Sequence, residues 1–270
     1  MNASTPQSAA GRTRRAFTLA ELLVVIAIVG VLLSLVLGSV SKAKSRAMRT
    51  ECLGNLRQLT LVWQMHYSEN DDKLVPNHRP RSAINSSTPP AWVQGDRHYA
   101  HDTVTNSEFL TDPKYAAFAG MVPNPRAYRC PAVRHKVKGV PLIRSFSMNQ
   151  YMGAVSQSDT EPGCATFNRV HDVSPPVQTF VFLEMNPYTI CSSMAYVPMD
   201  TKQAKGKFHM PTYLHGGRAA MAYADGHLDS YAVRDKDSLR TYQVDWIQDH
   251  DFAMTNADVI AIRQQATYLK

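Results

Sequence analysis

One apolar run near the N-terminus constrains this chain more than any other feature. Between residues 17 and 37 the only polar side chains are Thr18, Glu21 and Ser34. About 20 apolar residues suffice for a helix to cross a bilayer, whereas the apolar part of a secretory signal is about 7–15 residues long. We therefore predict a transmembrane helix over 17–37, preceded by a basic leader over 1–16.

The carboxylate inside this run predicts a partner. An ionisable side chain at the centre of a membrane helix costs about 2.5–3.5 kcal/mol on insertion scales, so it is usually paired and functional. Cleavage between Ala16 and Phe17 would create an α-ammonium group at Phe17, which the Glu21 carboxylate of a neighbouring helix can neutralise. A plain signal-anchor helix with an incidental glutamate is the simpler alternative.

The segment Phe17-Thr18-Leu19-Ala20-Glu21, behind its basic leader, resembles the N-terminus of type IV prepilins and of the pseudopilins of type II secretion systems. The resemblance implies that a prepilin peptidase cleaves after Ala16 and N-methylates Phe17, and that Glu21 then pairs with another pilin-like subunit. It also implies a single-pass inner-membrane protein whose N-terminus is cytoplasmic and whose C-terminal domain is periplasmic. Ala16 departs from the family, which usually has glycine there.

The formal net charge of +7 is concentrated beside the apolar run. Three arginines precede it, and five basic residues with one acid lie between positions 38 and 57. Because basic residues flank both ends, the positive-inside rule does not choose an orientation. Lipid headgroups or filament neighbours explain this distribution better than a nucleic-acid partner.

The pattern of a helix continues beyond the apolar run. Over 38–67 the apolar side chains recur every three or four residues, which predicts an amphipathic stalk helix packed on the rest of the chain. Together with the membrane segment it forms one helix from residue 17 to about residue 67. The members of the stripe are Met48, Cys52, Leu56, Leu59, Trp63 and Tyr67.

Residues 68–270 are long enough for one globular domain with its own core. The stretch 71–128 is rich in Pro, Asn, Asp, Ser and Thr, which predicts loops with a short strand at 91–94 and a short helix at 107–110. Strand patterns follow, and Thr255-x-x-Asp258 resembles a capping box before a helix over 256–269. The predicted fold is α+β and pilin-like, with the long N-terminal helix packed on a small antiparallel sheet domain that has extended loops and a C-terminal helix. The predicted strands lie at 140–143, 144–151, 177–184, 194–197, 218–224 and 227–233.

Two of these strands flank Asp225-Gly226, a pair that favours a two-residue type I′ hairpin turn. Nine residues, 216–224, lie between His215 and this pair. The element over 215–226 resembles the processing-associated His-x9-Asp-Gly element of a large pseudopilin-like group. The segments Cys52-x-x-Asn55-Leu56-x-Gln58-Leu59, Tyr128-Arg129-Cys130-Pro131, Arg144-Ser145-Phe146-Ser147-Met148-Asn149 and Phe180-Val181-Phe182-Leu183-Glu184 add to that resemblance.

The His-x9-Asp-Gly element has two interpretations. In the first it is structural: Gly226 accepts positive φ in the turn, and His215 bonds to backbone or to Asp225. In the second, His215, Asp225, His227 and Asp229 bind a divalent cation, although this mixture of imidazole and carboxylate indicates no single metal. No other cofactor is predicted.

The four cysteines contain no Cys-x-x-Cys pair. A periplasmic domain permits disulfides, and a bond between Cys164 and Cys191 is one interpretation because these residues flank a strand-like run. Free buried thiols are the alternative.

The chain has no nucleophile-elbow, zinc-protease, phosphate-loop or dinucleotide motif, so no enzymatic activity is predicted. The preferred function is a structural, prepilin-like subunit of a type II secretion pseudopilus or a type IV pilus-like fibre. The alternative is a membrane-anchored periplasmic domain that binds a ligand such as a polysaccharide and uses the prepilin signal only for delivery.

Overall fold

The computed structural model describes residues 18–78, 89–95, 101–156, 159–239 and 250–269, apart from the side chains at 35–38, 41 and 101. The cleavage site between Ala16 and Phe17 lies outside these residues. The chain forms two compact units, residues 1–44 and residues 45–270.

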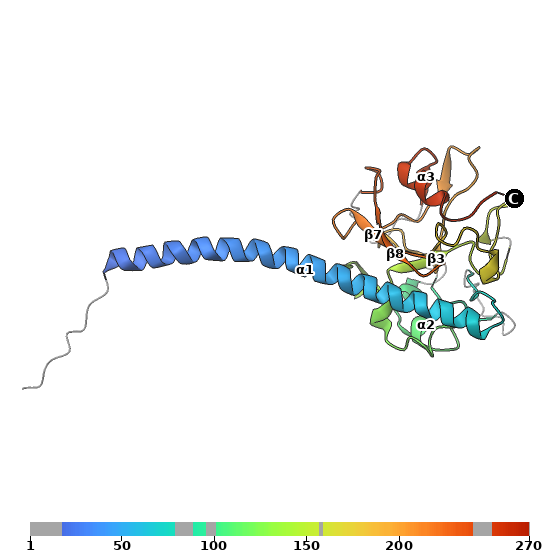
Figure 1. Cartoon of the computed structure of the whole chain (residues 1–270), viewed down its shortest axis with the longest axis horizontal. Helices are drawn as coiled ribbons and strands as arrows, with labels where there is room; N and C mark the ends of the chain where they lie inside the picture. Colours follow the sequence, from blue (N-terminus) through green and yellow to red (C-terminus); the bar gives the residue numbers. More distant parts are fainter. Residues whose placement is uncertain (1–17, 79–88, 96–100, 157–158, 240–249, 270) are drawn as a thin grey trace, which may run out of the picture. The chain divides into compact units, whose positions relative to one another are not determined.

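The longest element is helix α1, Leu19–Glu69, which agrees with the predicted helix over 17–67 (Figure 1). Its first turn is capped by reciprocal hydrogen bonds: the Thr18 backbone N–H donates to Glu21 Oε2 (2.9 Å) and the Glu21 N–H donates to Thr18 Oγ1 (3.3 Å). This is the capping-box arrangement. The membrane span predicted over 17–37 is not confirmed: in the described part of the chain, no helix has the length and apolar character needed to cross a membrane.

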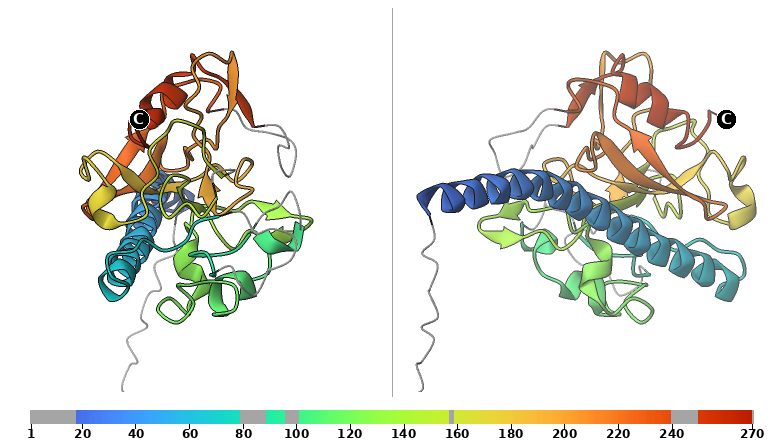
Figure 2. Two further views of the ribbon diagram at one scale, coloured as in Figure 1. Left: turned by 90° about the vertical axis from the view of Figure 1, so that its right-hand side faces the viewer. Right: turned by 60° about the vertical axis from the view of Figure 1, so that its left-hand side comes forward.

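The second half of α1 carries the predicted apolar stripe. Leu56, Leu59 and Trp63 are fully buried, and Tyr67 packs edge-on against Trp63 with 5.1 Å between ring centroids. Figure 2 shows this part of the helix between the green ribbon of residues 101–141 and the orange hairpin of residues 218–232. The stripe is therefore confirmed as the face that joins the helix to the domain.

The domain is built around a five-stranded sheet in the order β5-β3-β4-β7-β8. All neighbouring pairs are antiparallel except β3 and β5, which are parallel. The five strands are β3 Phe146–Asn149, β4 Phe180–Glu184, β5 Met194–Ala195, β7 Arg218–Tyr223 and β8 Leu228–Ala232. The α+β class is confirmed, and the pilin-like fold stays a prediction. The sheet itself is mixed and not purely antiparallel as predicted, because β5 joins β3 in the parallel direction.

Two small sheets lie outside the main one. The first pairs β1, Lys136–Val137, with β2, Val140–Pro141. The second pairs β6, Lys205–Lys207, with β9, Asp251–Ala253. The sequence predicted only part of the first sheet, because strands of two or three residues carry almost no periodic signal.

The hairpin β7–β8 is formed as predicted, but its turn is different. Gly226 has φ of 93°, while Asp225 is not in the left-handed region. The Tyr223 N–H donates to the His227 carbonyl, so the loop has three residues, 224–226. A type I′ turn needs positive φ at both central residues, whereas a three-residue hairpin loop ends on a single left-handed glycine.

The described parts of 71–128 contain more helical turns than predicted. The short helix α2, Glu108–Thr111, confirms the prediction at 107–110, and two 3₁₀ helices accompany it, η1 His101–Val104 and η2 Pro125–Tyr128. The strand predicted at 91–94 is not formed. Trp92 in this segment is instead a fully buried core residue, packed edge-on against Phe182 of β4.

The C-terminal helix α3 covers only Ala257–Arg263, and its residues Val259 and Ile262 are fully buried. Its cap is Asn256, which accepts hydrogen bonds from the Asp258 and Val259 backbone N–H groups. The capping box predicted from Thr255 is therefore wrong. Asp258 is buried and accepts the Tyr231 hydroxyl (2.6 Å) instead, so a tertiary contact uses the carboxylate that the local pattern assigned to the helix end.

Candidate metal centre and N-terminal motif

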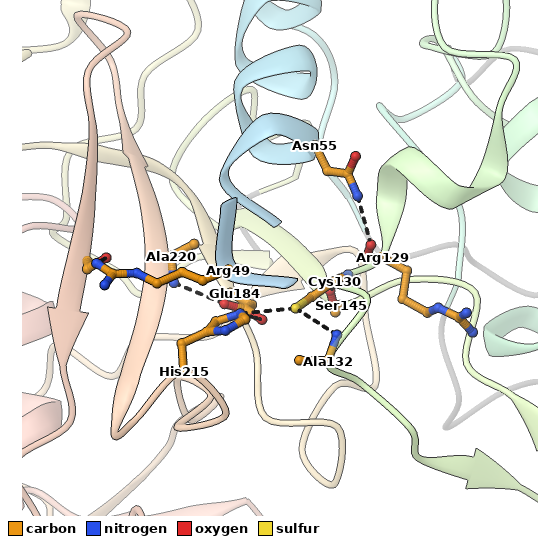
Figure 3. A network of polar contacts seen from close by, with 10 residues as sticks. Arg49, Asn55, Arg129, Cys130, Ala132, Ser145, Glu184, His215 and Ala220 are labelled. Carbon is orange, nitrogen blue, oxygen red and sulfur yellow. Dashed lines mark hydrogen bonds and ion pairs between the residues drawn. The ribbon is translucent and has the colours of Figure 1, made fainter. Parts of the chain in front are cut away.

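Four buried side chains with metal-ligating chemistry meet in the domain. Cys52 comes from α1, Cys130 follows η2, Glu184 ends β4, and His215 lies in the loop before β7. One potential ligand atom from each lies within 4.8 Å of every other. We call these four residues the buried cluster. Figure 3 shows three of them, Cys130, Glu184 and His215, pointing toward one another.

The imidazole of His215 lies at the centre of the measured contacts. Its Nε2 atom is 3.1 Å from Cys130 Sγ and 3.4 Å from Glu184 Oε1. Glu184 Oε2 accepts the Ala220 backbone N–H at 3.0 Å, while the buried Oε1 has no hydrogen bond. One ring nitrogen thus faces a sulfur and a carboxylate oxygen, and a single proton on that nitrogen cannot serve both.

The backbone holds Cys130 in place for this arrangement. Its N–H donates to Ser145 Oγ at 2.7 Å, and the Ala132 N–H points at its sulfur, 3.4 Å away. Backbone N–H groups directed at sulfur stabilise the thiolate form, which is the form that binds metals. The turn through Cys130-Pro131-Ala132 is thereby prepared for a negatively charged sulfur.

Contacts within the buried cluster shift the pKa values of its members in different directions. A hydrogen bond to Cys130, reinforced by burial, raises the pKa of the Cys52 thiol. The same bond, with help from His215, lowers the pKa of Cys130 despite burial. Burial opposes a charged His215, but the nearby Cys130 sulfur and the Glu184 side chain outweigh burial and raise the pKa of His215 to about 10.

The helix that carries Cys52 is also tied to the segment that carries Cys130. Asn55 Nδ2 donates to the Arg129 carbonyl at 3.0 Å and to the Arg126 carbonyl at 3.3 Å (Figure 3). On the other side, Arg49 donates to Ser230 Oγ of β8 at 2.6 Å. The cluster thus lies where α1, the Cys130 turn and the sheet come together.

The cation site predicted from His215, Asp225, His227 and Asp229 is not assembled. His227 bonds Asp225 at 2.6 Å and stacks on Tyr223, while Asp229 accepts the neighbouring Ser230 N–H. Within the described residues, neither group of potential metal ligands includes any of the three positions after β7. The physical reason is that β7 separates His215, before its first residue, from the turn after its last.

Sequence reasoning found His215 but missed Cys52, Cys130 and Glu184 as its neighbours. Each lies in a segment that was singled out for its resemblance to the pseudopilin-like group: the stalk segment, Tyr128–Pro131 and Phe180–Glu184. The shared presence of an isolated Cys or Glu in each segment was the available signal.

A second buried group contains Cys191, His209 and His250. Cys191 Sγ is 3.1 Å from His209 Nε2, and His209 Nδ1 is 2.9 Å from the Met194 carbonyl. The two imidazole rings are perpendicular with 5.2 Å between centroids. This group offers three ligands among the described residues, one fewer than the buried cluster.

None of the four cysteines forms a disulfide, so the bond considered between Cys164 and Cys191 is not formed. The two residues have different neighbours. Cys191 contacts His209, whereas the backbone of Cys164 forms an isolated antiparallel β-bridge with Leu269. The alternative of free buried thiols is the one that the structure contains.

At the other end of the chain, Glu21 lies in the first turn of α1 and is exposed. Both hydrogen bonds that its Oε2 accepts come from Thr18, at 2.9 and 2.8 Å. Thr18-x-x-Glu21 is a capping-box pattern, so Glu21 also caps the first turn of its own helix, a role that was not predicted.

Comparison with known proteins bears on this end of the chain. A family model described as the prokaryotic N-terminal methylation motif matches residues 11–37. No curated protein matches the chain, and no solved structure does. The matched residues include the predicted cleavage site and Glu21, so the N-terminus is that of a prepilin-like precursor, and the match does not extend to the His-x9-Asp-Gly element.

Proposed function

We propose that this protein is a prepilin-like structural subunit that assembles into a type II secretion pseudopilus or a type IV pilus-like fibre. The match of the N-terminal methylation motif to residues 11–37 carries the proposal. A prepilin peptidase would cleave between Ala16 and Phe17 and methylate the new N-terminus. The role is structural, and no catalytic step is assigned to this chain.

The surface of α1 in the first unit supports assembly. Large apolar side chains from Leu19 to Leu33 are exposed all around the helix, with exposed fractions of 45% or more. Exposed apolar surface of this extent marks a site of contact with protein or lipid. We propose that this segment anchors the precursor in the inner membrane, with the N-terminus cytoplasmic and the domain periplasmic, and that it then packs against other subunits in the fibre.

Glu21 would change partners during assembly. In the single chain its carboxylate caps its own helix through Thr18. After cleavage, the α-ammonium group of a neighbouring subunit offers a positive charge, which a carboxylate in apolar surroundings binds more strongly than a neutral donor. The proposed interaction therefore requires the charge of Glu21 and not merely its capping oxygen.

The His-x9-Asp-Gly element has a place in this proposal. His215 joins the buried cluster, and at the far end of β7 a Cβ added to Gly226 would lie 2.5 Å from Gln64 Nε2 of α1. We propose that this element fastens the β7–β8 hairpin along the second half of α1, so that the domain is held by the helix that enters the fibre.

Two variants of the capping pair test the role of Glu21. Glu21→Gln keeps a side chain that serves a capping box but removes the charge, whereas Thr18→Ala removes the cap and keeps the charge. The measurement is the amount of fibre, or of cross-linked oligomer, formed by each variant in cells with the assembly machinery. We expect the Gln variant to lose assembly and the Ala variant to retain most of it.

Processing provides the independent measurement. Mass spectrometry of the membrane-extracted protein should find an N-terminal peptide that begins with methylated Phe17. An intact leader, or a cut beyond residue 37, would contradict the proposed function, as would normal assembly of the Glu21→Gln variant.

A further inference from the structure

We infer that the buried cluster of Cys52, Cys130, Glu184 and His215 is a structural binding site for a thiophilic divalent transition metal, with Zn²⁺ as the best fit. This inference goes beyond the proposed assembly function and does not depend on it. It rests on the donor set, the distances, the burial and one unsatisfied oxygen.

The donor set selects the metal class. Two thiolates and an imidazole favour borderline to soft metals, and they exclude Ca²⁺ and Mg²⁺, which take oxygen ligands. A carboxylate is a known companion ligand of Zn²⁺. Four protein ligands complete a tetrahedral shell and leave no position for a substrate, which is the pattern of a structural site.

The distances suit such an ion. With Zn–S near 2.3 Å and Zn–N or Zn–O near 2.0 Å, tetrahedral ligand atoms lie about 3.3–3.8 Å apart. His215 Nε2 is already 3.1 Å from Cys130 Sγ and 3.4 Å from Glu184 Oε1, and all four atoms lie within 4.8 Å. Rotamer adjustments of about an ångström would complete the shell.

The second, independent observation concerns Glu184. Its side chain is fully buried, and Oε1 is a buried oxygen without a hydrogen bond. Its one ion-pair partner among the described residues is His215, which also faces the Cys130 sulfur. A buried charge with incomplete compensation is strongly unfavourable, and a divalent cation between these groups removes the deficit.

The surrounding bonds have the form of an outer shell. Ala220 N–H orients Glu184 through Oε2 and leaves Oε1 directed into the cluster. Ala132 N–H lies 3.4 Å from the Cys130 sulfur. Such outer contacts fix the orientation of metal ligands and typically change affinity by about 10–100-fold when removed.

The site would act as a clamp on α1. It connects residue 52 of the helix to residues 130, 184 and 215, which are distant in sequence. The metal would therefore stabilise the folded domain and its attachment to the helix, and binding would release the protons held by the thiols and the imidazole.

The test uses the full-length chain purified in a mild detergent, stripped of metal and titrated with Co²⁺ and Zn²⁺. Co²⁺ reports tetrahedral thiolate ligation through a sulfur-to-cobalt charge-transfer band. The protein carries a Cys191→Ser change throughout, so that the second buried group does not contribute its sulfur. Cys130→Ser and His215→Ala are compared with Cys164→Ser, the same chemical change outside both groups.

We expect the reference protein and the Cys164→Ser variant to bind one equivalent with the charge-transfer band. The Cys130→Ser and His215→Ala variants should lose that equivalent or bind it at least 100-fold more weakly. An unchanged stoichiometry and spectrum in the Cys130→Ser variant would overturn the inference. So would a disulfide between Cys52 and Cys130 in the protein as isolated, since it would consume both thiolates.

A measurement on the unsubstituted protein covers the case in which these variants fail to fold. Pulse alkylation in moderate denaturant, followed by peptide mass spectrometry, compares the Zn²⁺-loaded and chelator-treated forms. Zn²⁺ should slow the labelling of Cys52 and Cys130 at least 10-fold relative to Cys164. Equal labelling with and without Zn²⁺ would overturn the inference.

Discussion

The two halves of α1 share one backbone helix but have opposite surroundings. In the first unit its large apolar side chains are exposed, as with Leu32 at 56%, whereas in the second unit Leu59 is 0% exposed. The first half is apolar on every side, and the second confines its apolar residues to one stripe. The first is therefore suited to contacts outside the chain, and the second to contacts within it.

This difference teaches where the stability of the domain resides. Helical stability in proteins comes mostly from the packing of an apolar face and less from intrinsic propensity. Residues 45–69 have such a face and polar anchors at Asn55 and Arg49. Substitutions there should destabilise the domain, while the same substitutions in the first half should affect assembly alone.

Matched leucine truncations give the largest expected effect. Leu59→Ala should reduce the free energy of unfolding of the domain by about 2–5 kcal/mol, because it removes a fully buried side chain and leaves a cavity. Leu32→Ala should change it by less than about 0.5 kcal/mol, as expected for an exposed position. Denaturant unfolding of both variants measures the difference. Equal losses in the free energy of unfolding would contradict the division of α1 into an exposed half and a packed half.

Metal removal should have the next largest effect. A ligand at 100 times its Kd stabilises the folded state by about 2.7 kcal/mol. For a domain of this size that amount corresponds to a rise in Tm of roughly 5–10 °C. A chelator should lower the Tm of the Zn²⁺-loaded protein accordingly and leave Cys130→Ser unchanged. A chelator that has no effect on the loaded protein would contradict the clamp on α1.

Backbone strain at the tip of the β7–β8 hairpin predicts a smaller loss of stability. Gly226→Ala should cost about 1–2 kcal/mol, because residue 226 has φ of 93°, which side chains adopt only with strain. The added Cβ would also approach Gln64 Nε2, but that atom ends a flexible side chain and can move aside. Adding Gln64→Ala should therefore recover less than about 0.5 kcal/mol in thermal unfolding. Full recovery would show that the contact with α1, and not backbone strain, sets the cost.

The smallest effect is expected at the exposed end of the second half. Arg49→Ala removes its hydrogen bond to Ser230, a contact at the surface. Exposed substitutions of this kind usually change stability by about 0.5 kcal/mol or less. Lys42→Ala in the first unit is the control, and a loss above 1 kcal/mol for Arg49 alone would make this contact a main anchor of the helix.

Much of the helix could be predicted, since a 3.6-residue period is visible in a single sequence. The exact cap of α3 and the turn of the hairpin could not be predicted. Asp258 was assigned to a capping box, but Tyr231 competes for its carboxylate. Asp225-Gly226 indicated a two-residue turn, but the strand register places three residues in the loop.

The buried cluster lies beyond local reasoning altogether. His215 was selected for its spacing to Asp225, yet its partners come from three other segments of the chain. The one signal for Cys52 and Glu184 is that each lies in a segment that resembles the pseudopilin-like group. Their local patterns are those of an ordinary helix and an ordinary strand, which do not indicate that the two residues lie close together.

The sequence by itself determined the processing motif, the long helix, and the face by which that helix joins the domain, since all three depend on residues close together along the chain. Only the tertiary structure decided that Cys52, Cys130, Glu184 and His215 meet, and that Asp225 and His227 stay apart from them. The physical reason is that a metal-ligating set needs atoms a few ångströms apart in space, and only the packing of α1, the segment after η2, β4 and the loop before β7 brings these distant residues to that separation.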